Sequence, residues 1–344
     1  MTETNETKLV APISARVLPD EIGEREFTHY ETGLSPLGDN YDPYAMAVHD
    51  ACLRKTAKNL GIAYSPDLDI VCRTCLYHTR MPGIYMRADG RCNMCHAFED
   101  GLKRAVKDGR LASELKAALD PSETTDKSCD VIVALSGGKD SSAVLGYVAQ
   151  ELGLRTVAVL VDNQFIPDYV KENCATMCAQ VGAEFVVLDF DFRPEIRQLM
   201  KAEQLEFVPC NVCSKRFKKL ITDYATEIGC HRVLTGRNTW ATIEPEVSGE
   251  RLLKAYNDTI VSWYCLPFLL RWRMDDITSR LNEIKWNQRN KNIPGNSTNC
   301  LVPGMIGERF ESLSGINADT ALIADEVIVG FISRSEGLEI VTED

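Results

Sequence analysis

The segment IVALSGGKDSS at residues 132–142 ends an apolar run with two glycines, a lysine, an aspartate and three serines. A buried strand that breaks into a glycine-rich turn and restarts as a helix brings free backbone N–H groups and the positive end of the helix dipole to one point. Gly137 and Gly138 let the backbone approach phosphate oxygens closely, Lys139 adds positive charge, and the serine hydroxyls donate hydrogen bonds. The segment therefore predicts an anion-binding turn.

The spacing of this turn is not that of a Walker A loop, G-x-x-x-x-G-K-S/T. SGGKDS after an apolar strand instead resembles the PP-loop of the N-type ATP pyrophosphatase superfamily, whose members cleave ATP between its α- and β-phosphates. Two further strand ends, AVLVDNQF at 158–165 and HRVLTGRNTW at 231–240, match strand ends of that superfamily. The resemblance implies Mg²⁺, catalytic roles for Lys139 and Asp140, and these ATP-binding residues: Ser136, Gly137, Gly138, Lys139, Asp140, Ser141, Ser142, Asp162, Gly236 and Asn238.

Four cysteines form two CxxC pairs separated by sixteen residues: Cys72 and Cys75, then Cys92 and Cys95. This spacing is typical of a tetrahedral Cys₄ zinc ribbon, in which each pair lies on a tight knuckle and the thiolates lie about 2.3 Å from Zn²⁺. Four sulfur ligands fill the coordination shell, so the sequence predicts a structural zinc site rather than a catalytic one. His78 and His96 are nearby alternative ligands.

A second group of cysteines is more dispersed, with Cys210 and Cys213 in EFVPCNVCSKRFKKL and Cys300 far downstream in NSTNCLVP. Three thiolates suit a 4Fe–4S cluster with one exposed iron. The arrangement resembles the iron–sulfur-dependent thiolation branch of the PP-loop superfamily, which includes enzymes that put sulfur on tRNA bases. A persulfide-forming pair, a second zinc ion and buried cysteines stay open as alternatives, and Cys230 or Cys265 is a candidate fourth ligand.

The order of zinc ribbon, SGGKDS and the C-terminal stretch GFISRSEGLEIV is also similar to that of N-acetyl sugar amidotransferases. Both resemblances imply that a carbonyl oxygen attacks the α-phosphorus of ATP, diphosphate leaves, and a nucleophile then displaces AMP. The nucleophile is sulfide in one case and ammonia in the other. Cysteines that follow the sheet favour sulfur, as does the lack of a recognisable glutaminase segment. SGERLLK is loosely similar to thiolating enzymes, and Arg251 within it is either a substrate contact or a solvated helix residue.

The charge pattern bears on the partners. The net charge of −12 argues against a surface that neutralises phosphates throughout, and the best basic stretch is SKRFKK at 214–219. We therefore expect a small heterocyclic acceptor, such as a nucleobase, together with a sulfur donor, in preference to tRNA. A nucleotide-sensing binding protein is the non-enzymatic alternative, and a homodimer is common among the proteins that the chain resembles.

The elements that must position these residues follow an alternating pattern. From Cys129 onward, apolar strands are separated by helices of about a dozen residues, which predicts an α/β fold with a doubly wound parallel sheet. Residues 101–120 predict one amphipathic helix that ends near Pro121. We divide the chain into an extension at 1–66, a zinc ribbon at 67–100, a helix and linker at 101–128, and a PP-loop domain with a helical C-terminal part at 129–344.

The composition indicates a globular protein of 344 residues, 44% of them hydrophobic, with thirteen cysteines. No apolar run approaches the ~18–20 residues of a membrane span, and no secretory signal is visible, so we expect a cytoplasmic protein without a membrane partner. Thiols stay reduced in that compartment, which favours metal binding or sulfur chemistry over disulfides. Four other cysteines are expected to be buried: Cys52, Cys129, Cys174 and Cys178.

Overall fold

The computed structural model describes residues 9–10, 63–64, 71–79, 81, 84, 86–87, 89–107, 109–120, 129–201, 209–237, 250–254, 260–286, 299–314, 317 and 319–342. Of the region at 1–66, only the short parallel pair β1 (Leu9–Val10) and β2 (Ala63–Tyr64) is described. In the described part of the chain, no helix combines the length and the apolarity that crossing a bilayer requires.

A six-stranded sheet in the order β5-β4-β3-β6-β8-β7 forms the centre of the fold. Five strands are parallel, which confirms the predicted doubly wound parallel sheet, and the edge strand β7 runs antiparallel to β8. Arg251 lies in β7 opposite Trp263, so the alternative of a solvated helix residue at this position is wrong. The strands are β3 (Val131–Ala134), β4 (Thr156–Asp162), β5 (Glu184–Asp189), β6 (Arg232–Thr235), β7 (Glu250–Lys254) and β8 (Ile260–Cys265).

Helices cover both faces of this sheet. On one face lie α6 (Lys139–Gly146) and α7 (Asp168–Val181), and on the other lies α9 (Pro209–Glu227). Side chains of the central strand β3 alternate between the two cores, because successive residues of a strand point to opposite faces. Every residue of β3 is buried, as a strand covered on both faces requires.

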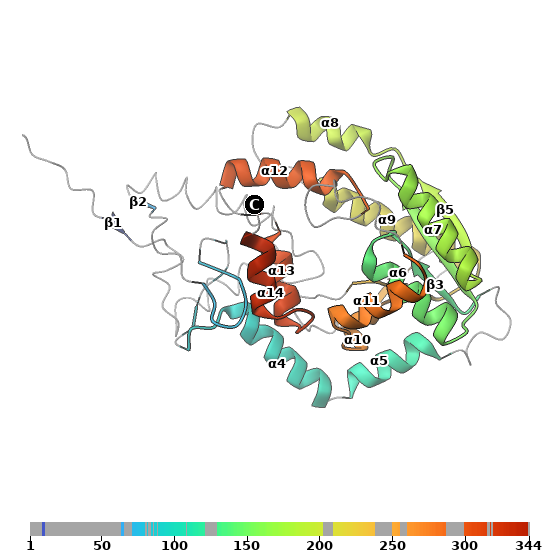
Figure 1. Ribbon diagram of the computed structural model, residues 1–344, viewed down its shortest axis with the longest axis horizontal. Coiled ribbons are helices and arrows are strands. Elements are labelled where there is room, and N and C mark those ends of the chain that lie inside the picture. Colours follow the sequence, from blue (N-terminus) through green and yellow to red (C-terminus); the bar gives the residue numbers. More distant parts are fainter. Residues whose placement is uncertain are drawn as a thin grey trace, which may run out of the picture.

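The remaining helices lie outside these layers (Figure 1), with α10 and α11 packed against α6 and α8 packed against α9. A π-helical turn (Tyr147–Glu151) continues α6. The others are α4 (Asn93–Lys107), α5 (Arg110–Leu119), α8 (Arg193–Lys201), α10 (Leu266–Leu269), α11 (Met274–Glu283), α12 (Val302–Ser314), α13 (Thr320–Ile328) and α14 (Arg334–Thr342).

The single helix predicted at 101–120 is two helices in the structure. Helix α4 begins inside the second CxxC pair and ends at Lys107, and α5 begins at Arg110. Gly109 between them has a φ of 66°, in the left-handed region that ends helices and that glycine adopts without steric cost. Each half is amphipathic by itself, but the apolar face shifts at the break: Leu111 follows Leu102 by nine residues, about half a turn out of phase in a continuous helix. The prediction of one helix overlooked this shift.

Three of the four cysteines expected to be buried are buried: Cys129, Cys174 and Cys178. Cys174 and Cys178 lie one turn apart on α7 and pack into the same core. Burial raises the pKa of both thiols to about 12, so neither is suited to nucleophilic chemistry. Cys52 lies outside the described residues.

Candidate functional site

The turn after β3 depends on the glycine at 137. Its φ is 80°, and a Cβ on this residue would lie 2.5 Å from Cγ1 of Val170 and 3.0 Å from Sγ of Cys174. Glycine alone therefore fits here, for both conformational and steric reasons. The turn leads directly into α6, whose first residue is Lys139.

Serine hydroxyls hold this turn in shape. Oγ of Ser141 accepts the N–H of Ser136 at 3.2 Å and donates to the carbonyl of Gly138 at 3.2 Å. The N–H of Gly138 donates to Oγ of Ser136 at 3.4 Å. Ser142 is fully buried in α6. Two of the three serines predicted as phosphate donors thus also stabilise the conformation of the turn.

Lys139 and Asp140 form an ion pair at the start of α6. Nζ of Lys139 lies 3.0 Å from Oδ1 and 2.9 Å from Oδ2 of Asp140. Burial raises the pKa of the Asp140 carboxyl, although the charge of Lys139 counteracts part of this shift. Nζ of Lys139 also lies 5.3 Å from the ring centroid of Phe331, a cation–π contact that the sequence did not predict.

A cavity of about 690 Å³ opens beside this turn. It lies at the carboxyl ends of β3 and β6, where the strand order reverses and ligands of open α/β sheets bind. Its volume is within the range of small-molecule sites. The wall is formed by Ala134, Ser136, Gly138, Lys139, Asp140, Ser141, Phe217, Thr235, Gly236, Arg237, Met274, Thr278, Leu281, Asn282, Trp286 and Asn299.

The ends of β3 and β6 meet closely in this wall. A Cβ at Gly236 would overlap the backbone of Asp140 and Ser141, so the chain after β6 touches the start of α6. Thr235 and Arg237 line the cavity on either side of this contact. The structure therefore brings the SGGKDS turn and the end of β6 together, while Asn238 lies outside the described residues.

Asp162, at the end of β4, is not part of the cavity wall. Its carboxylate accepts the N–H of Gln164 at 2.7 Å and Nζ of Lys171 at 2.9 Å. The same carboxylate contributes to the electrostatic environment of Cys300, which places Asp162 on the side of the dispersed cysteines.

Two wall residues from segments that follow the sheet donate hydrogen bonds to backbone carbonyls of the turn. Nε1 of Trp286 donates to the carbonyl of Gly137 at 3.1 Å, and Nδ2 of Asn299 donates to the carbonyl of Ser136 at 2.9 Å. The only signal for Asn299 in the sequence was its position beside Cys300. Trp263 and Trp272 are buried core residues.

The dispersed cysteines lie together at the same end of the sheet. Nδ2 of Asn163 lies 3.6 Å from Sγ of Cys213 and 3.5 Å from Sγ of Cys300. Cys210 packs in the same apolar cluster, whose other members are Phe165, Phe190, Phe192, Ile196, Val302, Met305 and Ile306. Burial raises the pKa of Cys213 to about 11 and also raises that of Cys300, and the Asn163 amide opposes both shifts.

The two candidate fourth ligands lie elsewhere. Cys230 is buried in the core under α9, near the carbonyl of Arg232. Cys265 lies at the end of β8, and its Sγ is 3.8 Å from Oγ1 of Thr235. Neither belongs to the apolar cluster that surrounds the other three cysteines.

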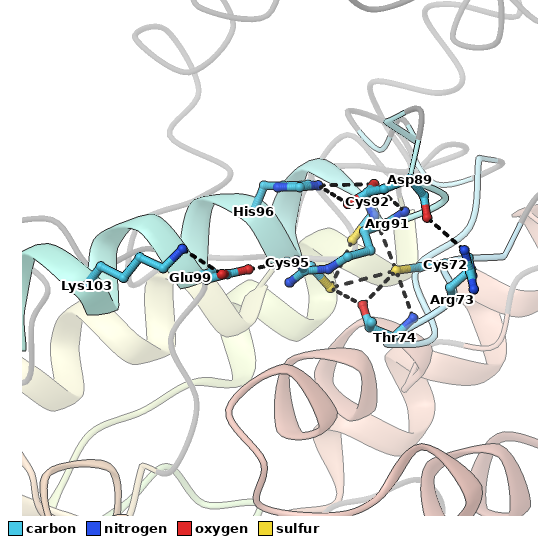
Figure 2. A network of polar contacts seen from close by, with 10 residues as sticks. All are labelled: Cys72, Arg73, Thr74, Asp89, Arg91, Cys92, Cys95, His96, Glu99 and Lys103. Carbon is cyan, nitrogen blue, oxygen red and sulfur yellow. Dashed lines mark hydrogen bonds and ion pairs between the residues drawn. The ribbon is translucent and has the colours of Figure 1, made fainter.

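The four cysteines at 72–95 form a compact sulfur site. Figure 2 shows three of them, Cys72, Cys92 and Cys95. The sulfur–sulfur distances are 3.7 Å for Cys72 and Cys95, 3.6 Å for Cys75 and Cys92, and 3.6 Å for Cys92 and Cys95. A tetrahedron with metal–sulfur bonds of about 2.3 Å has edges of about 3.8 Å, so the four thiols fit one tetrahedral metal ion. All four are buried.

Polar groups around this site stabilise thiolates. Oγ1 of Thr74 lies 3.0 Å from Sγ of Cys95 and 3.3 Å from Sγ of Cys72, and the N–H of Cys92 donates to Sγ of Cys72 at 3.2 Å. Hydrogen bonds, first from Cys75 and then from the other thiols, lower the pKa of Cys72. Nε2 of His96 lies 3.1 Å from Asp89, an ion-pair distance (Figure 2). Among the described residues, only these four cysteines bring their ligand atoms together here.

Comparison with known proteins gives distant relatives. No family model matches the chain. An uncharacterised protein of Methanocaldococcus jannaschii is 23% identical over 208 residues, which are 60% of this chain and 69% of that protein.

Three solved structures are similar at low TM-scores. The U34-tRNA thiolase NcsA from Methanococcus maripaludis, with its 4Fe–4S cluster, has a TM-score of 0.38 and 14% identity, covering 80% of this chain and 89% of that one. NMN synthetase from Francisella tularensis has a TM-score of 0.37 and 13% identity, and the alignment covers 68% of this chain and 90% of that one. NH₃-dependent NAD synthetase from Campylobacter jejuni, in complex with nitrate, has a TM-score of 0.29 and 18% identity. Its alignment covers 37% of this chain and 55% of that one, little more than half its length.

Proposed function

We propose that this chain is an ATP-dependent sulfurtransferase. It adenylates a carbonyl oxygen of a small heterocyclic acceptor, such as a nucleobase, and replaces that oxygen with sulfur. A sulfur donor supplies the sulfur through the thiols of Cys210, Cys213 and Cys300. The acidic chain favours a small acceptor, and tRNA is the alternative substrate.

One observation carries the proposal: the turn and the dispersed cysteines are joined by adjacent residues. Asn299 donates to the carbonyl of Ser136 in the turn, and the next residue is Cys300, which lies with Cys213 around the Asn163 amide. Phe217, one helical turn after Cys213 on α9, lines the cavity. A sulfur atom held by these thiols would therefore be next to the cavity in which the acceptor is activated.

The residues of the cavity support the first step. The turn N–H groups, the α6 N-terminus and Lys139 would bind the phosphates of ATP, and Mg²⁺ would accompany them. The acceptor carbonyl oxygen attacks the α-phosphorus, the bond to the bridging oxygen breaks, and diphosphate leaves. Hydrosulfide then adds to the activated carbon, AMP leaves with the former carbonyl oxygen, and the lost proton passes to solvent.

The two cysteine groups suit different metal centres. Among the described residues, only the four at 72–95 bring all their ligand atoms within 4.8 Å of one another, which suits a single structural Zn²⁺. The wider set of Cys210, Cys213 and Cys300 suits a cluster of several irons, because a cube separates its thiolates further than one ion does. A 4Fe–4S cluster there would supply an open iron that holds sulfide. The Asn163 amide and the apolar shell fit such a cluster.

A second candidate function, ATP-dependent amidation of an N-acetyl sugar, has one observation in its favour. The C-terminal stretch GFISRSEGLEIV packs on the four-cysteine site, where Arg334 donates to the carbonyls of Cys72 and Cys75. The two segments that carry the resemblance to amidotransferases are therefore physically linked. Ammonia would replace sulfide as the nucleophile, and the adenylation step would be unchanged.

The test is to purify the protein without oxygen and assay it with ATP, Mg²⁺, sulfide and a panel of acceptors. We expect AMP and diphosphate, a thiolated product, and an absorption band near about 400 nm from the cluster. Cys300→Ala should lose the absorption band and the thiolated product. Cys129 is buried in the core between the sheet and α9, and Cys129→Ala should retain both. Release of ADP and orthophosphate would refute the proposal. A colourless protein with one zinc ion and ammonia-dependent AMP release would select amidation.

A further inference from the structure

The last two helices contact the four-cysteine site at residues 72–77, which contain the first CxxC pair and are called the knuckle below. Nε of Arg334 donates to the carbonyl of Cys75 at 3.2 Å, and Nη2 donates to the carbonyl of Cys72 at 3.4 Å. The fully buried Tyr77 donates its hydroxyl to Oδ1 of Asp325, also buried, at 2.9 Å. The knuckle is thus hydrogen-bonded to both α13 and α14, which lie side by side in Figure 1.

The packing at this contact leaves little room for movement. A Cβ at Gly337 would lie 2.9 Å from Cδ1 of Leu76 in the knuckle and 2.9 Å from Cγ2 of Val327 in α13. The backbone of α14 therefore lies directly against the knuckle and against α13. A displacement of the knuckle would be passed to both helices.

The turn between α13 and α14 reaches the nucleotide site. Phe331 is 1% exposed, and its ring lies below Nζ of Lys139, 5.3 Å from ring centroid to nitrogen. Its carbonyl accepts the N–H of Met274, the first residue of α11 and part of the cavity wall, at 3.3 Å. Its N–H donates to the carbonyl of Glu326 in α13 at 2.9 Å. Phe331 thus joins α13, α11 and the lysine of the turn.

We propose that Phe331 is a positioning residue that links metal occupancy of the four-cysteine site to the hold of Lys139 on the phosphates of ATP. The inference rests on the proposed function, because it takes Lys139 as a phosphate ligand. Metal binding supplies the folding free energy of such knuckles. Without metal, Arg334 and Asp325 lose their fixed partners in the knuckle, and the turn that carries Phe331 loses its support.

The first experiment measures the affinity of the full-length, metal-loaded protein for α,β-methylene ATP with Mg²⁺ by calorimetry. Phe331→Leu keeps an apolar side chain but removes the ring, and we expect about three- to tenfold weaker binding with unchanged metal content. Phe268→Leu is the matched control, since Phe268 is also buried and its ring packs edge-on against Phe98 at 6.5 Å. Binding by Phe331→Leu as tight as that of the wild type overturns the inference.

A double-mutant cycle separates positioning from a general loss of structure. In the Lys139→Met background, Phe331→Leu should weaken binding no further, because the ring acts through the lysine. An undiminished effect in that background overturns the inference. Chelation of the metal should weaken binding more in the wild type than in Phe331→Leu, and an equal loss in both proteins also counts against it.

Failure of this inference can be told apart from failure of the proposed function. If Phe331→Leu does not fold, Arg334→Met tests the same link, and we expect weaker binding of the analogue; wild-type affinity in that variant overturns the inference. If the wild type itself does not bind α,β-methylene ATP, the proposed function and this inference fall together. If the wild type binds and the variants bind equally well, the inference alone falls.

Discussion

At the scale of single residues, Gly236 decides how closely the chain after β6 approaches the first turn of α6. A Cβ there would overlap the backbone of Asp140 and Ser141. We expect Gly236→Ala to lose nucleotide binding and about 1–3 kcal/mol of stability, because the backbone cannot move aside without disturbing the start of α6. Calorimetric titration with an ATP analogue and urea unfolding measure the two effects.

Gly153→Ala provides the comparison for this prediction. Gly153 has a φ of 66°, and a Cβ on this residue would have no neighbouring group within 4 Å. Alanine there therefore costs only backbone strain of about 1 kcal/mol. We expect this variant to bind nucleotide normally. Normal binding by Gly236→Ala would contradict the close approach of the two strand ends.

Thr74 contacts two sulfur atoms of the four-cysteine site. Its hydroxyl lies 3.0 Å from Sγ of Cys95 and 3.3 Å from Sγ of Cys72, where it can donate to a thiolate ligand. Thr74→Val keeps the shape and removes the donor, and we expect about tenfold weaker metal binding in chelator competition. Thr176→Val, on the exposed surface of α7, should bind metal like the wild type. Equal affinity in both variants would show that the hydroxyl contributes nothing.

Lys218 gives a pH-dependent prediction. Burial, together with the positive charge of Arg237, lowers its pKa to about 8. Below pH 8 the lysine is charged in both the folded and unfolded states, and the folded state carries the full desolvation cost. Between about pH 8 and the ordinary lysine pKa of 10.5, only the unfolded state binds the proton, so stability rises with pH from this group.

Removing the charge should remove that rise. We expect Lys218→Met to unfold in urea with a smaller gain in free energy between pH 8 and pH 10.5 than the wild type, by on the order of 2 kcal/mol. Lys103→Met, at an exposed lysine of α4, is the control and should follow the wild-type profile. Identical profiles for the wild type and Lys218→Met would contradict the lowered pKa.

At the scale of elements, α9 connects the dispersed cysteines to the sheet. Its first turns carry Cys210 and Cys213, Phe217 lines the cavity, and Thr222 receives a hydrogen bond from Nε1 of Trp263 in β8 at 3.1 Å. Both groups of that bond are buried. The bond therefore fixes the position of α9 along β8, and with it the position of both cysteines.

Thr222→Val leaves the indole N–H of Trp263 buried without an acceptor. We expect a loss of about 1–3 kcal/mol in the free energy of unfolding, measured in urea. Thr222→Ser retains the hydroxyl, and its free energy of unfolding should fall by less. If valine and serine destabilise equally, the cost comes from packing and not from the hydrogen bond.

At the scale of the whole molecule, the four-cysteine site and the sheet share one core. The four cysteines and Tyr77 belong to the same apolar cluster as Val131 and Leu160 of the central strands. We therefore expect a single cooperative unfolding transition by circular dichroism and tryptophan fluorescence, shifted to lower temperature when the metal is chelated. Two separated transitions would mean that residues 67–100 fold as an independent unit.

The local pattern of the sequence was sufficient for the parallel sheet and for the glycine-rich turn between β3 and α6. Apolar runs such as CDVIVAL and RTVAVLVD became β3 and β4 because strands buried on both faces need continuous hydrophobic residues. The spacing of the four cysteines predicted a compact site because a CxxC pair brings two thiols to one knuckle. The break at Gly109 was missed because each half is amphipathic by itself and the shift of the apolar face between Leu102 and Leu111 was overlooked.

Contacts between distant segments were decided only by the tertiary structure. Trp286, Asn299 and Phe331 reach the turn from 149 or more residues away, and no local period marks them. Asp162 shares a strand end with Asn163, yet it lies outside the cavity wall. Sequence patterns record which backbone a segment prefers and which face it buries. Which side chains meet across the sheet depends on strand order and helix packing, and these follow from the whole chain together.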